Sequence, residues 1–363
     1  MKLLHFLLFT LLVQGIFAQE KEPRSFSVLS KTGFLIAHRS QMSHLVQGLN
    51  YGLELEFAKQ RSNFNFYSEE LRWPVQGFSF TYQDFGFRDV LGVGFGVMQF
   101  TKLNLYQGKK FGFLDMKLAS GFSVITKDYD AIGNPKNNAI GSHLNHLISA
   151  QLTWEKHIGH VNFGLGLEIN HYSNASMNAP NLGLNTPMLH VKLGYNDAPR
   201  KVYEPFEGDV IAILPRYSNN FHVALLTTFK QNLPGLTPSK FLPIVGVQGA
   251  YRRFLNLKWD LEGTVDVIYN QANRVFYEDQ TYSFLQTVQL GATVGVAYNF
   301  YKAQIYIGLG GYFYNHINPA GWIYNRIGYR RKFGESERWL GFCGIKAHLG
   351  KADYMEAGVA YVF

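Results

Sequence analysis

The sequence predicts an all-β protein, a transmembrane antiparallel up-and-down β-barrel with an even number of strands, twelve to sixteen and most simply sixteen. Three observations support this fold class. The chain is rich in aromatic residues and glycine, with 30 Phe, 22 Tyr and 36 Gly in 363 residues, and only 17% of it is charged. Many segments alternate between large apolar and small or polar residues. No apolar run of helix length follows the N-terminal stretch. Alternating, aromatic-rich segments separated by polar turns are typical of barrels that cross outer membranes.

The first eighteen residues have the pattern of a secretory signal peptide. Lys2 precedes an apolar run over 3–17, and Ala18 is a small residue at the expected cleavage point. The run is too short for a good membrane-spanning helix. We therefore expect residues 1–18 to be removed on export and residues 19–363 to form one large barrel. Cys343 is the only cysteine, so an intrachain disulfide is excluded.

The alternation also predicts which row of each strand faces lipid. In 91–97 the odd positions are large and apolar and the even positions are glycine, and in 303–309 the odd positions are apolar. In 114–118 the polar row consists of Asp115 and Lys117. Charges and glycines on one row and large apolar residues on the other fit a crowded polar lumen with lipid outside. The glycines do not indicate a dinucleotide-binding loop, because no helix follows them.

The same pattern marks sixteen strand candidates. They are bounded by polar turns and run over 25–36, 49–58, 75–84, 90–101, 111–125, 145–157, 160–172, 187–195, 218–229, 241–252, 257–270, 282–299, 302–314, 323–333, 338–349 and 352–363.

Four long polar stretches between the candidates are expected at the outer end of the barrel: 126–144, 173–186, 271–281 and 315–322. The turns at 157–160 and 300–301 are short, as inner turns of such barrels are. The linker over 196–217 is long for an inner turn and could hold a plug or a short helix. The chain ends on Phe363, which looks like the sorting signal of outer-membrane barrels.

Four charged residues lie on polar rows: Asp115, Lys117, Glu155 and Glu168. We expect them to form ion pairs that fill the lumen, and the alternative is that they line a pore. The formal net charge of +8 favours contact with phosphate-bearing lipid, although a generic basic composition explains it equally well. His143 and His146 are three residues apart and so face opposite sides of a strand, a poor geometry for one metal. We interpret them as surface or structural histidines.

A candidate catalytic site lies in the stretch 171–185. The segment 161–170 alternates strictly, and His171 and Ser173 continue its apolar row. At i and i+2 on one face of a strand, their Cα atoms lie about 6.5–7 Å apart, so the side chains can meet. The alternative interpretation is a polar strand end that leads into a loop.

Ester hydrolysis by a serine needs a base, a group that orients the base, and donors for the oxyanion. Ser173 is the candidate nucleophile and His171 the candidate base. Asn174 and the backbone N–H of Ser176 are the candidate oxyanion donors. Asn185 has the same parity as His171, and hairpin pairing would bring it beside that histidine. An acid could instead come from Asp128 or Asp130, whereas the parity of Glu168 places it in the lumen.

The run His171-Tyr-Ser-Asn-Ala175, followed by Pro180-Asn-Leu-Gly-Leu-Asn185, resembles the lipid A 3-O-deacylase (PagL-like) or acyloxyacyl hydrolase family. The segments 134–137, 140–145 and 346–353 resemble its larger members. The resemblance implies a nucleophile at Ser173, a base at His171, and an oxyanion site at Asn174 and the amide of Ser176, where the best-known members have Gly. The acid of the family falls on Asn185, and an amide can orient a histidine but cannot supply negative charge.

The expected function is therefore that of an outer-membrane serine esterase that removes an ester-linked acyl chain from lipid A. Its partners would be lipopolysaccharide and the membrane, with no nucleic acid, and this chemistry requires no metal or cofactor. The strand before the site runs outward if the N-terminus is inside, which places His171 and Ser173 at the outer leaflet. Two alternatives remain open: a non-enzymatic pore or structural barrel, and an outer-membrane phospholipase.

Overall fold

A computed structural model describes residues 22–62, 66–108, 110–205, 219–231, 241–275, 282–300, 302–317, 321–334, 336–349 and 351–363. The expected signal peptide, 1–18, lies outside these residues. Within the described ranges, no helix has the length and apolar character needed to cross a membrane.

The first half of the chain forms a closed, eight-stranded antiparallel barrel. Its strands are β1 (Arg24–Gly33), β2 (Asn50–Gln60), β3 (Val75–Asp84), β4 (Val93–Gly108), β5 (Gly112–Ile125), β6 (Leu144–Ile158), β7 (Val161–Ser173) and β8 (Leu184–Asn196). β8 pairs back with β1, with Leu193 opposite Val28. Two short helices lie in its connections, η1 (Ser40–Leu45) and α2 (Phe66–Glu70).

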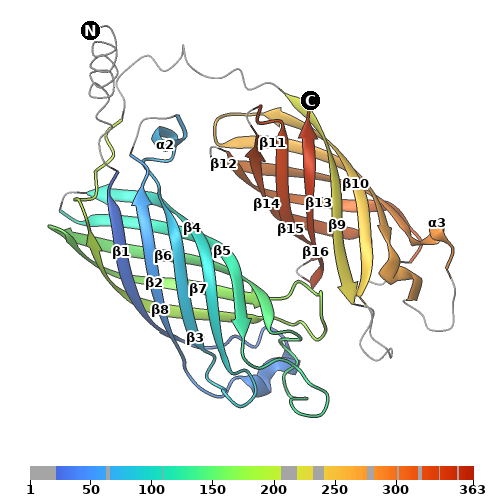
Figure 1. Cartoon of the computed structure of the whole chain (residues 1–363), viewed down its shortest axis with the longest axis horizontal. Helices are drawn as coiled ribbons and strands as arrows, with labels where there is room; N and C mark the ends of the chain where they lie inside the picture. The colour runs from blue at the N-terminus through green and yellow to red at the C-terminus, as the bar shows by residue number, and fades with distance from the viewer. Residues whose placement is uncertain are drawn as a thin grey trace, which may run out of the picture.

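The second half forms another closed barrel of eight strands, beside the first in Figure 1. Its strands are β9 (Asn220–Gln231), β10 (Phe241–Phe254), β11 (Trp259–Asn270), β12 (Val288–Phe300), β13 (Ala303–Asn315), β14 (Ile323–Phe333), β15 (Trp339–His348) and β16 (Lys351–Val362). β16 closes on β9, with Val359 opposite Leu225. The short helices η3 (Gln271–Val275) and α3 (Phe284–Thr287) lie between β11 and β12.

Among the described residues, the all-β class, the antiparallel pairing and the sixteen strands are confirmed, but the strands form two barrels in place of the single barrel expected over 19–363. The reason is that alternation defines the two faces of each strand and not its edge partner. An eight-stranded barrel has an interior that side chains can just fill, whereas sixteen strands in one barrel leave an aqueous channel. Two small barrels therefore let the polar rows pack against one another.

Two elements differ clearly from the prediction. β4 continues to Gly108, seven residues past the predicted end at 101, and the segment 282–287, predicted as strand, contains a short helix. Ser283 and Gln286 form a capping box there: Gln286 N donates to Ser283 Oγ (3.4 Å), and Ser283 N donates to Gln286 Oε1 (2.9 Å). Such reciprocal bonds satisfy the free donors of a helix start. The chain consequently makes the short helix α3 before β12 begins at Val288.

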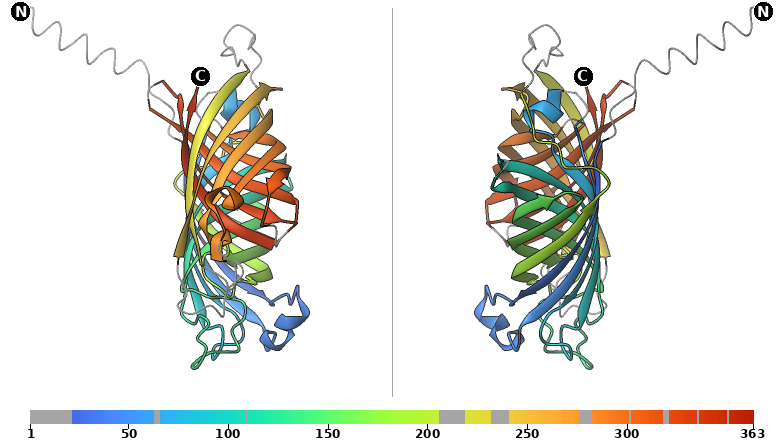
Figure 2. Two further views of the ribbon diagram at one scale, coloured as in Figure 1. Left: turned by 90° about the vertical axis from the view of Figure 1, so that its right-hand side faces the viewer. Right: turned by 90° about the vertical axis from the view of Figure 1, so that its left-hand side faces the viewer.

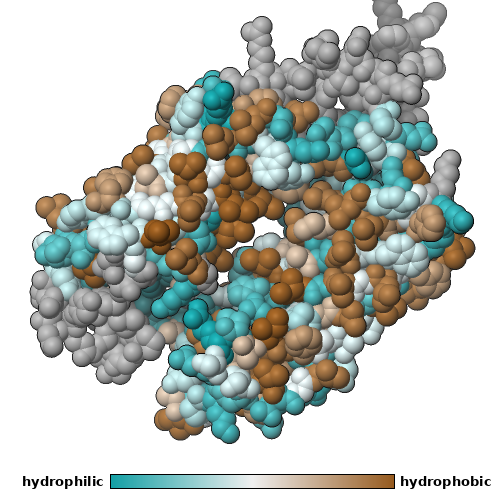
Figure 3. All heavy atoms as spheres, turned by 180° about the vertical axis from the view of Figure 1, so that it is seen from behind, coloured by the Kyte–Doolittle hydropathy of each residue, from teal (hydrophilic) through white to brown (hydrophobic). Residues whose placement is uncertain are grey.

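The predicted faces are confirmed within the strands, whereas Leu91, predicted on an outward row, precedes β4 and is buried. In β7, Phe163, Leu165 and Leu167 point out of the barrel and are 49%, 58% and 58% exposed, while Asn162 and Asn170 on the other row are buried. The space-filling view in Figure 3 shows hydrophobic side chains over much of the visible outer surface of both barrels. Their outer walls therefore have the apolar character of a surface that contacts lipid.

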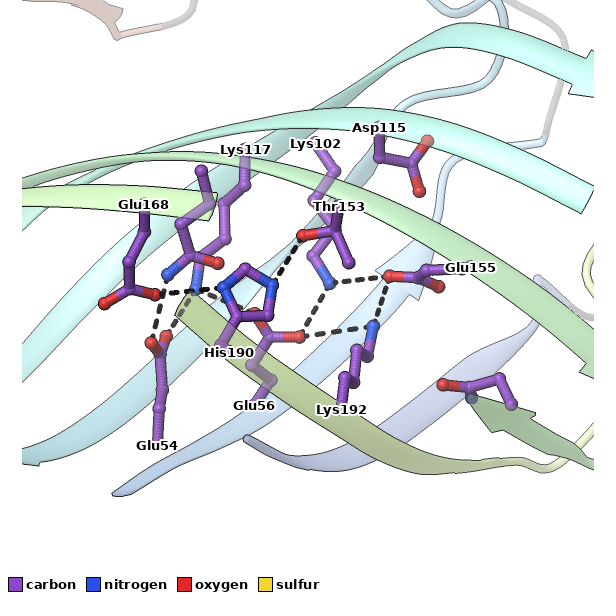
Figure 4. A network of polar contacts seen from close by, with 12 residues as sticks. Glu54, Glu56, Lys102, Asp115, Lys117, Thr153, Glu155, Glu168, His190 and Lys192 are labelled. Carbon is purple, nitrogen blue, oxygen red and sulfur yellow. Dashed lines mark hydrogen bonds and ion pairs between the residues drawn. The ribbon is translucent and has the colours of Figure 1, made fainter. Parts of the chain in front are cut away.

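The lumen of the first barrel is filled by ion pairs (Figure 4). Lys31 pairs with Glu54 and with Glu168 (2.8 Å), and Lys117 pairs with Glu54 and with Glu56 (2.7 Å). All of these side chains are almost completely buried. Further pairs join Lys102 to Glu56 and Lys192 to Glu155, both within 2.6 Å. The predicted lumen ion pairs of Asp115, Lys117, Glu155 and Glu168 are confirmed.

The segment after β8 covers the end of this barrel at which β8 ends. Arg200 reaches into the lumen, where its guanidinium donates two hydrogen bonds to Asp115 (2.5 and 2.8 Å) and lies over the ring of Phe113. The side chains of Gln60 and Gln107 bond the backbone at 201 and 203. The described part of the 196–217 linker thus acts as a plug, while residues 206–218 lie outside the described residues.

The barrels touch at both ends. At the end that carries α2, Lys258 of the β10–β11 turn pairs with Glu70 of α2 (2.9 Å). At the opposite end, the loop between β7 and β8 contacts β9 and β16. Figures 1 and 2 show the C-terminus at the same end as α2, opposite the long loops of the first barrel.

Candidate active site

The candidate site lies at the end of β7, on the outward row, as predicted. Tyr172 between the two candidate catalytic residues points inward, where its hydroxyl donates to Gln83 Oε1 (2.8 Å) and its ring packs edge-on against Phe85. Because side chains alternate along a strand, the inward-pointing Tyr172 holds His171 and Ser173 on the outer wall of the barrel.

The strand register brings the two neighbouring strands to the site. Asn185 of β8 lies directly opposite His171, and His146 of β6 lies directly opposite Ser173. The predicted pairing of His171 with Asn185 is therefore confirmed. The outward row is continuous across β6, β7 and β8, so the site is a polar patch on an otherwise apolar wall.

Asn185 orients the imidazole of His171. The distance from His171 Nδ1 to Asn185 Oδ1 is 2.7 Å, and Asn185 Nδ2 lies 3.1 Å from His38 Nδ1. The amide nitrogen can only donate, so its bond to His38 turns the amide oxygen toward His171. His171 Nδ1 then carries the proton, as this network assigns it, and Nε2 is left as an acceptor. This is the tautomer that a general base requires.

Ser173 is 5% exposed and is held by the loop that follows it. Its Oγ accepts hydrogen bonds from Asn181 Nδ2 (2.9 Å) and from the backbone N–H of Ala175 (3.0 Å). Ser173 Oγ makes no hydrogen bond to His171, although both residues are described, so the predicted contact is not formed here. Catalytic hydrogen bonds are often long in enzymes without substrate, and a rotation of the serine would be needed to form this one.

The two predicted oxyanion residues differ in how they are placed. The side chain of Asn174 is turned into the loop, where Nδ2 donates to Ser142 Oγ (3.1 Å) and to Asn178 O (2.8 Å). Ala175 and Ser176 have φ values of 53° and 61°. Among the described residues the backbone N–H of Ser176 has no hydrogen-bond partner. It is thus the predicted donor that remains available. Its left-handed backbone explains why glycine suits this position.

Three residues of the site were not predicted. Asn181 contacts Ser173 Oγ and also accepts from the backbone N–H of Asn174 (3.0 Å). His38 contacts Asn185, and the segment containing it is bonded to β8 through Ile36 N and Asn185 O (2.9 Å). His146, interpreted above as structural, shares the outward row with Ser173.

The outward position of His146 was detectable from its parity. It follows Leu144 and precedes Ile148 on the outward-facing row of β6, and its Nε2 lies 2.9 Å from Ser120 Oγ. His143 is turned elsewhere: its Nδ1 contacts the carbonyl of Ile125. A polar side chain in a lipid-facing row is energetically costly and therefore points to function.

None of the candidate carboxylates contacts His171 in the described structure. Asp128 lies 3.5 Å from His143, and Asp130 accepts backbone N–H groups of its own loop at 132 and 133. Glu168 is inside the barrel with Lys31. The group that orients His171 is therefore an amide.

Comparison with known families identifies the family of the chain. Residues 46–194 match the family described as lipid A 3-O-deacylase (PagL), and residues 219–363 match the acyloxyacyl hydrolase C-terminal domain. The chain belongs to the lipid A 3-O-deacylase family. The first match spans β2 to most of β8 of the first barrel, and the second spans all eight strands of the second barrel. Ser173, His171 and Asn185 all lie within the first match.

The chain was also compared with solved structures and with curated proteins. Solved structures similar to this deacylase-family chain include several variants of the Rhodopseudomonas blastica porin. Two of them are 10% identical in sequence, cover 94% of this chain and 99% of their own, and have TM-scores of 0.21. A search of curated proteins found no match.

Proposed function

We propose that this protein is an outer-membrane serine esterase that removes an ester-linked acyl chain from lipid A. The observation that carries the proposal is the outward row of Ser173 and His171, with His171 oriented by Asn185, in a chain of the lipid A 3-O-deacylase family. The row sits on an apolar outer wall, so a lipid ester can reach the serine from the membrane side without entering the barrel.

In the proposed reaction, Ser173 Oγ rotates toward His171 and attacks the ester carbonyl carbon. His171 Nε2 takes the hydroxyl proton, and the resulting tetrahedral intermediate carries an oxyanion. When the intermediate collapses, His171 gives the proton to the departing sugar hydroxyl, and the acyl chain remains on Ser173. Water activated by the same imidazole then hydrolyses the acyl-enzyme and releases the fatty acid.

We assign the oxyanion donors from the geometry of the loop. The N–H of Ser176 is free of other partners among the described residues, and Asn181 Nδ2 lies 2.9 Å from Ser173 Oγ. The side-chain amide of Asn174 is instead engaged with Ser142 and Asn178. Asn174 thus supports the loop, and Asn181 takes the role of side-chain oxyanion donor that was expected of Asn174.

The proposed location follows from the fold and the sequence together. Residues 1–18 would direct export, and the apolar walls would insert into the outer membrane. β7 runs from the short turn at 159–160 toward the long loops, so the site would lie at the outer leaflet, where lipid A resides. The filled lumen of the first barrel favours this enzyme over a pore, because Lys31, Lys117 and Glu54 close the channel.

Product analysis tests the proposal. Purified protein is incubated with lipid A and, separately, with phospholipid, and the products are weighed by mass spectrometry. We expect lipid A to lose one acyl chain, and Ser173→Ala to reduce the rate by at least about a thousandfold. Release of fatty acid only from phospholipid would favour the phospholipase, and equal release by the variant would exclude the mechanism. Thr227→Ala, on the exposed row of β9, is the matched control and should retain activity.

A further inference from the structure

The loop that carries the oxyanion donors is held from both sides. On one side it is bonded within the first barrel: Gly183 N donates to Ala139 O (3.0 Å), and the Asn178 side chain donates to Gly141 O. On the other side it is bonded to the second barrel. A loop fixed by two separate bodies can hold a conformation that neither of them would hold alone.

Three hydrogen bonds join the loop to the second barrel. Ala179 N donates to Gln231 Oε1 (2.8 Å), and Gln231 N donates to Met177 O (3.2 Å). Ser176 Oγ donates to Ala352 O (2.9 Å). These contacts restrain the backbone around the Ser176 N–H, because they bind the side chain of Ser176 and the peptide groups that follow it. In Figure 1 the β7–β8 loop reaches the ends of β9 and β16 that lie opposite the C-terminus.

The rim of the second barrel that makes these bonds is itself braced. Gln231 is the last residue of β9, and Ala352 lies in the neighbouring strand β16. Lys230 pairs with Asp353, the residues adjacent to Gln231 and Ala352, and Asp353 lies 3.4 Å from His348. Gln231 and Ala352, the two residues that bind the loop, therefore lie on neighbouring strand ends that the ion pair between Lys230 and Asp353 connects.

The loop needs such support because of its backbone. Ala175 and Ser176 both have a positive φ, which residues with a Cβ adopt at a cost and keep only where the surroundings fix it. The direction of the Ser176 N–H depends on these two angles. Loss of the bonds to the second barrel would let the loop relax and turn that N–H away from the position of the oxyanion.

We propose that the second barrel positions the oxyanion loop of the first, with Gln231 as the positioning residue. This inference rests on the proposed function, since it assigns the loop a role in ester hydrolysis. It gives the second barrel a part in the reaction without any contact to substrate. A purely architectural barrel would hold the two halves together and leave the rate of the chemical step unchanged.

The test compares Gln231→Ala with Gln231→Glu in the full chain, using lipid A in detergent micelles. Glutamate keeps an acceptor oxygen for Ala179 N, whereas alanine removes it. We expect Gln231→Ala to lower kcat about tenfold with KM unchanged, less than the loss of an oxyanion donor itself. Gln231→Glu should keep most of the wild-type kcat. Lys258→Ala removes the contact between the barrels at the other end and should have no effect on kcat.

Three results would overturn the inference: a wild-type kcat in Gln231→Ala, an equal loss in the alanine and glutamate variants, or an equal loss in Lys258→Ala. Each of them would assign the contact to architecture alone. Failure of the proposed function is distinguishable, because the wild-type protein would then release no fatty acid from lipid A or Ser173→Ala would release as much.

Discussion

The two barrels have the same number of strands and the same antiparallel order, but they differ at the end away from the C-terminus. In the first barrel the outward row changes from apolar to polar there, at His171, Ser173 and Asn185. In the second, the outward row of β9 is still apolar near that end, at Phe229, and so is that of β13, at Phe313. A function built on such a fold thus depends on a few residues at strand ends, while the barrel supplies a rigid support.

The lumens differ as well. The first barrel is filled mainly by lysine–carboxylate pairs, whereas the second uses arginine with aromatic rings. Arg330 pairs with Glu262 (2.5 Å) and lies over Tyr306, and Arg326 pairs with Asp266 (2.5 Å). Both arrangements neutralise buried charge, so two different residue sets satisfy the same need of a narrow polar lumen.

The largest expected effect concerns the independence of the two closed barrels. Glu54→Leu leaves Lys31 and Lys117 without a shared carboxylate partner, and breaking such a buried pair costs about 3–5 kcal/mol. We expect the free energy of unfolding of the first barrel alone to fall. Unfolding in urea, followed by protease protection of each half, measures it.

Glu262→Leu is the matched variant in the second barrel, where it removes the partner of Arg330. It should lower the stability of that half and leave the first unchanged. If either substitution lowers the free energy of unfolding of both halves equally, the barrels unfold as one unit and do not have independent stabilities.

The next effect separates orientation from charge at the site. Asn185→Leu removes the acceptor for His171 Nδ1, and we expect kcat to fall about a hundredfold. Asn185→Asp keeps the acceptor and adds negative charge that stabilises the imidazolium, so kcat should rise about tenfold. Steady-state release of fatty acid from lipid A measures both. An unchanged rate in both variants would mean that Asn185 does not act on His171.

A smaller effect is expected at the two histidines around the start of β6. His146→Phe removes an imidazole opposite Ser173, and we expect kcat/KM to fall about tenfold, because this ring lines the polar patch. His143→Phe replaces a ring that contacts Ile125 O and does not lie on the outward row of the site. This variant should therefore retain the wild-type rate. Equal losses in the two variants would show that the position of His146 is not specific to the site.

The strands were predictable because their evidence is local. Period-two alternation is visible within each segment, and it also placed His171 and Asn185 on one row. The closure into two barrels was not predictable, since it depends on β8 meeting β1 far away in the sequence. The capping box at Ser283 has a sequence signature, a serine three residues before Gln286, but the prediction extended the alternation of the following strand over it.

The contacts of the β7–β8 loop were likewise not predictable from local sequence patterns. The role of Asn181 depends on the chain folding back over Ser173, and that of His38 on a bridge between Ile36 and Asn185. The support from Gln231 depends on a second barrel that the expected single barrel did not include. Sequence patterns identified the residues on the strand, whereas the residues that surround them came from contacts between distant segments.

The most direct measurement is the mapping of a covalent adduct. A fluorophosphonate ester reacts with an activated serine, and peptide mass spectrometry then identifies the modified residue. We expect one adduct, on Ser173, that is absent in Ser173→Ala and strongly reduced in His171→Ala. An adduct on Ser120, the serine beside His146, or an adduct on Ser173 that forms equally well without His171, would contradict it.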